Sequence, residues 1–140
     1  QDASFYFANN QGANFDSANN QWASFTYTNN QNANFGFANN QGVNFSFANN
    51  QNANFGFANN QGVNFENSNN QGAYFNSANL KQVNWDNVIS IENANFQNAD
   101  LTSGINLPER INTKAKWIAE CGRSNVNAQT IWIDGTSILS

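Results

Sequence analysis

Small, large and polar residues recur along this chain with a period of five, which fits neither an amphipathic helix nor an ordinary strand. A small residue stands at every fifth position from Ala3 to Val43, and two residues later comes either Phe or Asn. This spacing suits a short extended segment with two inward side chains, one outward side chain between them, and two residues at a corner. The pattern therefore predicts short extended segments joined by regular corners.

The five-residue pattern is nested in a block of ten, A-N-N-Q-x-A/V-N-F-x-x, and in a stronger period of twenty. The Asn-Asn-Gln core of the block recurs without interruption from 9–11 to 69–71. Residues 28–47 and 48–67 match at 17 of 20 positions. Such self-similarity at a fixed period predicts a repeat architecture.

Units such as Ala13-Asn14-Phe15, each followed by two variable residues, resemble the pentapeptide repeat A-(D/N)-(L/F)-x-x. The resemblance covers about residues 3–106, and the units at 78–80, 94–96 and 99–101 are closest to the common form. It implies an all-β fold, a right-handed quadrilateral β-helix (solenoid) of about five coils. Each coil of this fold holds four pentapeptides, and the small and the large residue of each unit face inward.

The chain departs from the family pattern because every second large position is Asn. With twenty residues in a coil, two opposite faces carry aromatic stacks and the other two carry Asn stacks. A buried amide without a partner costs about 1–3 kcal/mol, so inward Asn residues predict amide ladders; the alternative is a register that turns them outward. The neighbouring Gln residues predict outward ladders in either register. The predicted interior stacks are Phe5, Phe25, Phe45, Phe65 and Trp85; Phe15, Phe35, Phe55 and Phe75; and Asn10, Asn20, Asn30, Asn40, Asn50, Asn60 and Asn70.

The repeat shifts by one position after residues 87–88, where we predict a bulge followed by a unit that reads Ile89-Ser90-Ile91. We predict two domains, a pentapeptide-repeat β-helix over 1–107 and a C-terminal cap over 108–140. In the cap, a helix is expected over 112–121 with Asn112 as its N-cap, and a short strand at 131–133. The T-I-W-x-D-G ending is similar to tails that close many family members, and its expected role is to cover the last coil.

Charge and composition exclude several classes of function. Only 10% of residues are charged, the net charge is −4 and no basic cluster exists, so neither direct nucleic-acid binding nor docking on a membrane is expected. The chain has no His, and its nine carboxylates are scattered. No catalytic, cofactor-binding or metal site is predicted, and the chain is expected not to be an enzyme.

The remaining single features are structural predictions. The recurring glycines Gly12, Gly42, Gly62 and Gly72 stand at corner positions and are read as turn residues. The one cysteine, Cys121, is expected to be a buried small apolar residue. A chain that starts at Gln1 is either a fragment or a mature exported form, and export to an extracellular location is the reading that we favour.

Outward aromatic residues are the candidate contact surface. Stacked at intervals of one coil, they would form exposed apolar stripes, which usually mark interfaces. The alternatives are a ring that folds over its own coil, an oligomer interface, or a surface for a carbohydrate or another protein. The open N-terminal edge is a second candidate, for head-to-head dimerisation, coaxial stacking or an upstream segment. The candidate aromatic residues are Phe7, Tyr27 and Phe47, then Phe37 and Phe57, and Trp22.

Three functions follow from these features. The first is a non-enzymatic scaffold for protein–protein interaction or self-assembly. The second, implied only by the family resemblance, is a DNA mimic that binds a type II topoisomerase such as gyrase. Six acidic residues against Lys81 give the repeat a net charge of −5. A duplex of about 25 Å presents roughly 15 charges, so the charge density of the repeat is too low for a close mimic of DNA. The third is an ice- or carbohydrate-binding surface.

Overall fold

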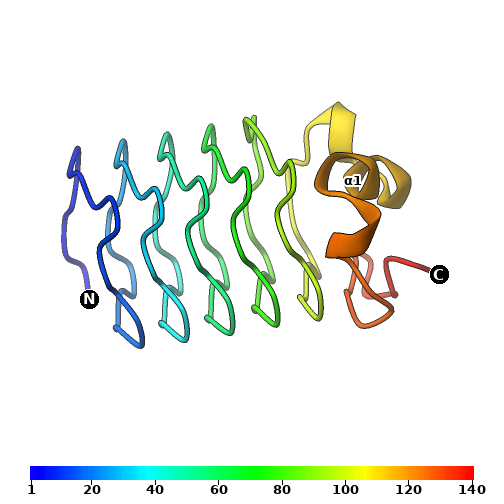
Figure 1. Ribbon diagram of the computed structural model, residues 1–140, viewed down its shortest axis with the longest axis horizontal. Helices are drawn as coiled ribbons and strands as arrows, with labels where there is room; N and C mark the ends of the chain where they lie inside the picture. The colour runs from blue at the N-terminus through cyan, green and yellow to red at the C-terminus, as the bar shows by residue number, and fades with distance from the viewer.

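The computed structural model describes residues 1–140 and shows a tube wound from successive similar coils (Figure 1). Parallel bridges join residues twenty apart, from Ser4–Ser24 to Asn64–Asn84. Around each bridge the backbone bonds run both ways: Phe5 N–H donates to the Ser24 carbonyl at 2.8 Å, and Ser24 N–H donates to the Ala3 carbonyl at 2.9 Å. Twenty residues therefore complete one circuit, and each side is held by single bridged residues and not by continuous strands.

Each corner is a tight turn whose second residue has a positive φ. Ala8 N–H donates to the Phe5 carbonyl at 2.8 Å, and Phe7, between them, has a φ of 63°. The outward Asn of each unit helps to form the corner that follows it, as where Gln11 N–H donates to Asn9 Oδ1 at 3.1 Å. Asn favours this local turn, which explains why it recurs in the middle of the repeat unit.

The predicted bulge is present, but its residues differ from the expected reading. Bridged residues are twenty apart up to Asn64–Asn84 and twenty-one apart from Asn69–Ser90 to Asn84–Ile105. Val88 N–H donates to the Trp85 carbonyl at 3.0 Å, which is the hydrogen bond that closes the corner. The Val88 side chain is fully buried, whereas Ile89 is 60% exposed. The unit reading that placed Ile89 inward was wrong, because the corner bond fixes Val88 as the inward residue and pushes Ile89 out.

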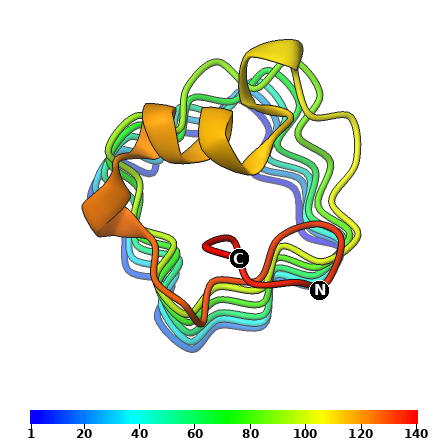
Figure 2. The same cartoon turned by 90° about the vertical axis from the view of Figure 1, so that its right-hand side faces the viewer.

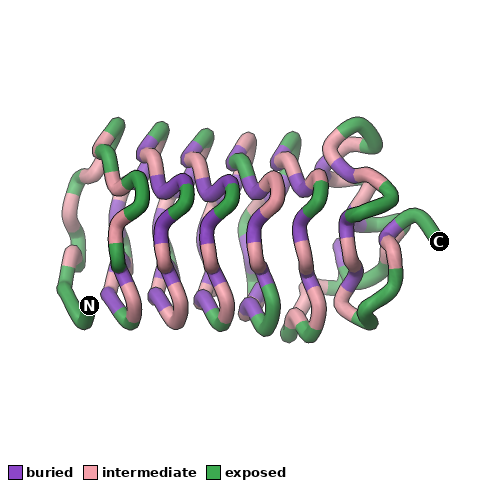
Figure 3. The backbone as a smooth tube through the Cα atoms, turned by 90° about the horizontal axis from the view of Figure 1, so that it is seen from below, coloured by how far each residue is buried: buried purple, intermediate pink, exposed green.

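Two columns of aromatic rings fill the tube, as predicted. Phe25 lies 5.1 Å from Phe45, and Phe35 lies 5.1 Å from Phe55, with their planes 29° and 3° apart. The two columns also contact each other edge to face, with Phe25 and Phe35 centroids 5.4 Å apart at 84°. Both arrangements are favoured by the ring quadrupole. Figure 3 shows how burial alternates along each coil and is lowest in the first.

Two columns of Asn form the predicted amide ladders. Asn30 Nδ2 donates to Asn50 Oδ1, and Asn50 Nδ2 donates to Asn70 Oδ1, both at 2.9 Å. Asn40 donates to Asn60 in the other column at the same distance. The inward register is confirmed and the outward alternative is excluded. Gln side chains form the outward ladders, in the pairs Gln21–Gln41, Gln31–Gln51, Gln51–Gln71 and Gln61–Gln82.

The two amide ladders end differently. Asn70 Nδ2 donates to Ser68 Oγ at 3.0 Å, and that hydroxyl donates to the Phe65 carbonyl at 2.7 Å. The Nδ2 of Asn60 is buried with no acceptor, because Leu80 stands in the next coil of its column. A buried donor left without a partner destabilises the fold by about 1–3 kcal/mol.

Beyond the repeat, three helical segments precede the final turn: η1 (Glu109–Ile111), α1 (Lys114–Cys121) and η2 (Arg123–Asn125). The Thr113 side chain accepts from Lys116 N–H at 3.2 Å, so Thr113 is the N-cap of α1. The prediction of Asn112 was wrong, since the 3-10 turn η1 ends there. Gly122, with a φ of 100°, is the C-cap of α1, so the helix ends at Cys121 as predicted.

The C-terminal segment lies across the end of the tube (Figure 2). Trp117 of α1 is fully buried, with its ring 5.1 Å from Trp85 and 5.0 Å from Phe96. Ile131 bridges Asp100, and Leu101 N–H donates to the Ile131 carbonyl at 2.8 Å. These contacts cover both the aromatic columns and one backbone edge of the last coil.

We expect Ala58→Ser to raise the free energy of unfolding by about 1 kcal/mol. The new hydroxyl has the relation to Asn60 that Ser68 has to Asn70, so it accepts from the unpaired Nδ2 and donates to the Phe55 carbonyl. Urea denaturation measures the change. Ala78→Ser is the matched control, because Leu80 offers no amide, and it is expected to give no gain. A gain in the control equal to that of Ala58→Ser would contradict the explanation.

A second test compares the loss of one amide from a ladder with the removal of the whole ladder. Asn40→Leu leaves Asn20 Nδ2 and Asn60 Oδ1 without their partners and is expected to destabilise the fold by about 2 kcal/mol or more. The triple variant Asn20→Leu, Asn40→Leu, Asn60→Leu leaves no orphaned amide, and Leu80 shows that leucine fits this column. Thermal unfolding should rank the triple variant above the single one. The reverse order would show that the ladder is not the source of the penalty.

Candidate interaction surfaces

Three aromatic residues form an exposed column at one corner, here named the Phe7 stripe: Phe7, Tyr27 and Phe47. Their exposed fractions run from 44% to 65%. Phe7 stacks on Tyr27 at 5.1 Å and 17°, and Tyr27 stacks on Phe47 at 4.7 Å and 10°. Tyr6 widens the stripe, with its ring 4.3 Å from Phe7. Sequence reasoning missed Tyr6, although its place beside Phe7 at the same corner was a usable signal.

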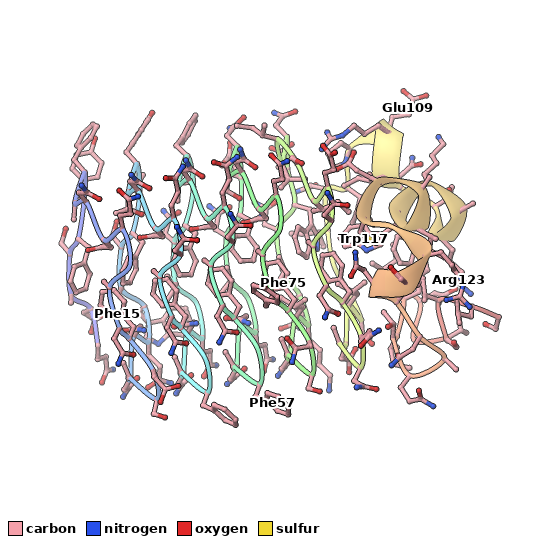
Figure 4. The ribbon with its side chains drawn as sticks, viewed as in Figure 1. Phe15, Phe57, Phe75, Glu109, Trp117 and Arg123 are labelled. Atoms are coloured by element: carbon pink, nitrogen blue, oxygen red, sulfur yellow. The ribbon has the colours of Figure 1, made fainter.

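A second aromatic corner is formed by Phe37 and Phe57, whose rings stack at 4.9 Å and 7° and are 63% and 54% exposed. Figure 4 shows Phe57 projecting outward, whereas Phe15 and Phe75 lie inside the tube. Tyr74, half exposed, stands beside this corner on the neighbouring face. Sequence reasoning did not select Tyr74, which replaces the usual Asn at an outward position.

Trp22, on a third corner, stands alone. Its ring lies over Gly42 of the next coil, where an added Cβ would meet Trp22 ring atoms at 2.2 Å. The Trp22 ring therefore packs on the following coil. The alternative, in which the ring folds over its own coil, does not hold for Trp22. Gly42 is needed here both for its φ of 68° and for the space it leaves.

The exposed aromatic residues share an unfavourable backbone conformation. All six candidates, Trp22 included, have φ between 56° and 63°. Bulky side chains rarely occupy this left-handed region, at a cost of roughly 1–2 kcal/mol per residue, and equivalent corners carry Gly12, Asn32 or Asn52. Strained residues of this kind cluster at functional sites. The aromatic corners are therefore not explained by the needs of the fold.

The Phe7 stripe carries no charge of its own, whereas Asp16 stands one coil before Phe37 at the second aromatic corner. Glu66 and Asp86 follow the Phe7 stripe along the same corner, one and two coils beyond Phe47. The two side chains whose pKa values are shifted lie elsewhere, in the C-terminal segment. Burial raises the pKa of the Cys121 thiol to about 12, and hydrogen bonds from Thr136 lower the pKa of the Asp134 carboxyl. The expected burial of Cys121 is confirmed, and its thiol stays neutral at physiological pH.

The N-terminal edge leaves backbone groups without partners. The N–H groups of Ser4, Asn9, Asn14 and Asn19 make no hydrogen bond, whereas those one coil later donate back to the first coil. Both Asn ladders also start here with free Oδ1 atoms, on Asn10 and Asn20, because the amide-to-amide bonds of both ladders run toward the C-terminus. The edge thus combines backbone donors with two columns of acceptors. The single α-helix, α1, has only eight residues, and no membrane-spanning helix is present.

Neither a family model nor a curated protein matches the chain. Solved structures do. A pentapeptide repeat protein from the Arabidopsis thaliana thylakoid lumen is 22% identical, with a TM-score of 0.53 over 97% of this chain and 81% of that one. HetL, a pentapeptide repeat protein of the cyanobacterium Nostoc involved in heterocyst differentiation regulation, is 24% identical with a TM-score of 0.50 over 98% and 58%.

A form of QnrB1, a plasmid-mediated fluoroquinolone resistance protein, is 18% identical with a TM-score of 0.64 over 76% of this chain. The chain spans half the length of that protein. These likenesses concern the fold, and they agree with the bridges at twenty-residue intervals, the stacked rings and the amide ladders. The chain has the quadrilateral β-helix fold of the pentapeptide-repeat proteins.

Proposed function

We propose that the chain is a non-enzymatic scaffold that associates with a second copy of itself through the Phe7 stripe. The scaffold comprises a right-handed solenoid of about five coils, residues 1–107, and a cap, residues 108–140. The observation that carries the proposal is the exposed stack of three rings held at left-handed backbone positions. Such a stripe is apolar, uncharged and rigid, and a second stripe of the same kind is complementary to it.

Charge favours an antiparallel arrangement of the two copies. In a parallel pair, Glu66 would face Glu66 and Asp86 would face Asp86 across the contact. In an antiparallel pair centred on Tyr27, Phe7 faces Phe47, and both acidic residues lie beyond the contact at opposite ends. Like charges directly opposed in a contact are unfavourable, so the two-fold antiparallel pair is the proposed form.

The N-terminal edge is a weaker candidate for self-association. In a head-to-head pair, the free Oδ1 atoms of Asn10 and Asn20 on one copy would approach the same acceptor atoms on the other. Two acceptors make no hydrogen bond. A second copy stacked in the same direction presents amide donors instead, so the edge suits parallel stacking better than a head-to-head dimer.

The DNA-mimic hypothesis receives less support. QnrB1 shares the fold but is only 18% identical. The acidic residues of this repeat occupy different columns, and only Glu66 and Asp86 follow one another at one corner. A duplex presents continuous rows of charge. Binding to gyrase therefore remains the secondary hypothesis for this chain.

Ice binding is disfavoured because the outward amides are already used. Asn59 Oδ1, for example, accepts from Gln61 N–H at 3.2 Å and from Asn79 Nδ2 at 3.1 Å. Groups bonded within the chain have less capacity to order water. Export from the cytoplasm remains a prediction, and the thylakoid lumen is the location of one protein of similar fold.

Self-association is tested by sedimentation equilibrium of the wild type at about 10–100 µM in 0.15 M salt, where charge repulsion is screened beyond about 8 Å. We expect a dimer, and a monomer for the variant Phe7→Ser, Tyr27→Ser, Phe47→Ser. The matched control, Phe37→Ser with Phe57→Ser, changes exposed rings on another corner and should remain dimeric. Circular dichroism melts establish that each variant folds.

The arrangement is tested by cross-linking in a Cys121→Ser background. Thr26→Cys lies near the centre of the stripe and should form a disulfide-linked dimer. Glu66→Cys should do so only in a parallel pair, so under oxidation it is expected to give no disulfide-linked dimer. A wild type that is monomeric throughout, or a triple variant that still dimerises, would overturn the proposal.

A further inference from the structure

We propose that the hollow beside Phe57 binds a neutral pyranose unit of an oligosaccharide. The hollow has a volume of about 350 Å³ and lies between the corner rings and Tyr74. This site is distinct from the Phe7 stripe, which lies at another corner, and does not depend on self-association. Its lining residues are Phe37, Asn54, Gly56, Phe57, Tyr74 and Asn76.

The rings offer an apolar surface that is accessible from one side. Phe37 covers one face of Phe57 in the stack. The equivalent corner position in the next coil is Ser77, whose small side chain leaves the other side of Phe57 without an aromatic neighbour. Tyr74 bounds the hollow on the adjoining face. A pyranose has an apolar face of C–H groups that stacks on such a ring.

Gly56 has no side chain to fill the hollow that it lines. Gly36 and Gly56 have no positive φ, so the backbone does not demand glycine there, and the same corner position holds Asp16 and Asn76 in other coils. A Cβ on Gly56 would come within 3.0 Å of Asn54 Oδ1 and 3.1 Å of Asn76 Oδ1. Glycine at this place therefore serves space and not backbone conformation.

The hollow also holds polar groups that the fold does not use. The Asn76 side chain and the Tyr74 hydroxyl make no hydrogen bond within the chain, whereas Asn54 donates to Asn34 Oδ1 at 3.2 Å and accepts from Gly56 N–H at 2.8 Å. One free amide and one free hydroxyl beside aromatic rings match the hydroxyl edge of a sugar. Sites with an apolar lining and few convergent polar groups are typical of small ligands.

The lining also argues against other ligands. It contains no charged residue, so it favours a neutral molecule over a phosphate or a carboxylate. It offers no open backbone edge for a peptide strand, because Phe57 N–H donates to the Asn76 carbonyl at 3.0 Å and Tyr74 N–H donates to the Ala53 carbonyl at 2.9 Å. Addition of a strand needs unpaired groups. A neutral saccharide is the class that fits.

The test is a calorimetric titration of the folded chain with three neutral probes in turn: cellopentaose, chitopentaose and maltopentaose. Saturation-transfer NMR on the same mixtures identifies the sugar protons in contact with the rings. We expect at least one probe to bind. Phe57→Ser and Asn76→Ala should each weaken that binding about tenfold or more, and Gly56→Val should abolish it.

Phe47→Ser is the matched control, since it removes an exposed ring at another corner and should leave saccharide affinity unchanged. Thermal melts confirm that each variant is folded, and Tyr74→Phe, which removes only a hydroxyl, provides a variant with minimal risk to folding. The proposal is overturned if none of the three pentasaccharides binds. It is also overturned if Phe57→Ser binds as tightly as the wild type. Neither result bears on dimerisation through the Phe7 stripe.

Discussion

The circuit of twenty residues is the constraint on which the rest of this structure depends, because it places each side chain directly over its counterpart in the next coil. Every column must therefore be filled by side chains that tolerate a copy of themselves at about 4.8 Å. Benzyl groups stack and carboxamides donate to one another, so both are self-complementary. Carboxylates and ammonium groups are not, which accounts for a charged fraction of only 10% in a chain of 140 residues.

The same constraint explains why the interior combines Phe with Asn. The two Phe columns meet edge to face, as where Phe45 and Phe55 centroids lie 5.4 Å apart at 82°, and so they fill the centre of the tube. The other two faces hold smaller side chains, and the ladder satisfies their polar atoms. Where the ladders stop, apolar residues take over in the same columns, Leu80 in one and Ile91 in the other.

Much of this arrangement could be predicted from the sequence because, once the period is known, residues twenty positions apart must lie in one column. The aromatic stacks, the amide ladders and the insertion near residue 88 follow from that period. The edge-to-face contact does not, since it depends on the width of the tube. Val88 and Ile89 are both apolar, so only the corner bond decides which one points inward, and likewise the hydroxyl geometry of Thr113 decides the helix cap. The Phe57 corner could be predicted from the one-coil spacing of its outward aromatic residues. Its hollow could not, because it depends on how Gly56 and Tyr74, from neighbouring coils, lie beside that corner.

The direction of the inner ladders has a consequence for how such a molecule changes in size. Each amide needs only an acceptor in the coil that follows, and residues 28–47 and 48–67 supply nearly the same set of side chains. A further copy of this segment inserted between them would find every partner already in place, while the first coil and the cap kept their own contacts. The tube can thus lengthen in fixed steps without redesign of its ends, and the distance between any two surface features that flank the insertion becomes a multiple of one step. Duplication of one coil therefore changes the separation of surface sites by a fixed increment.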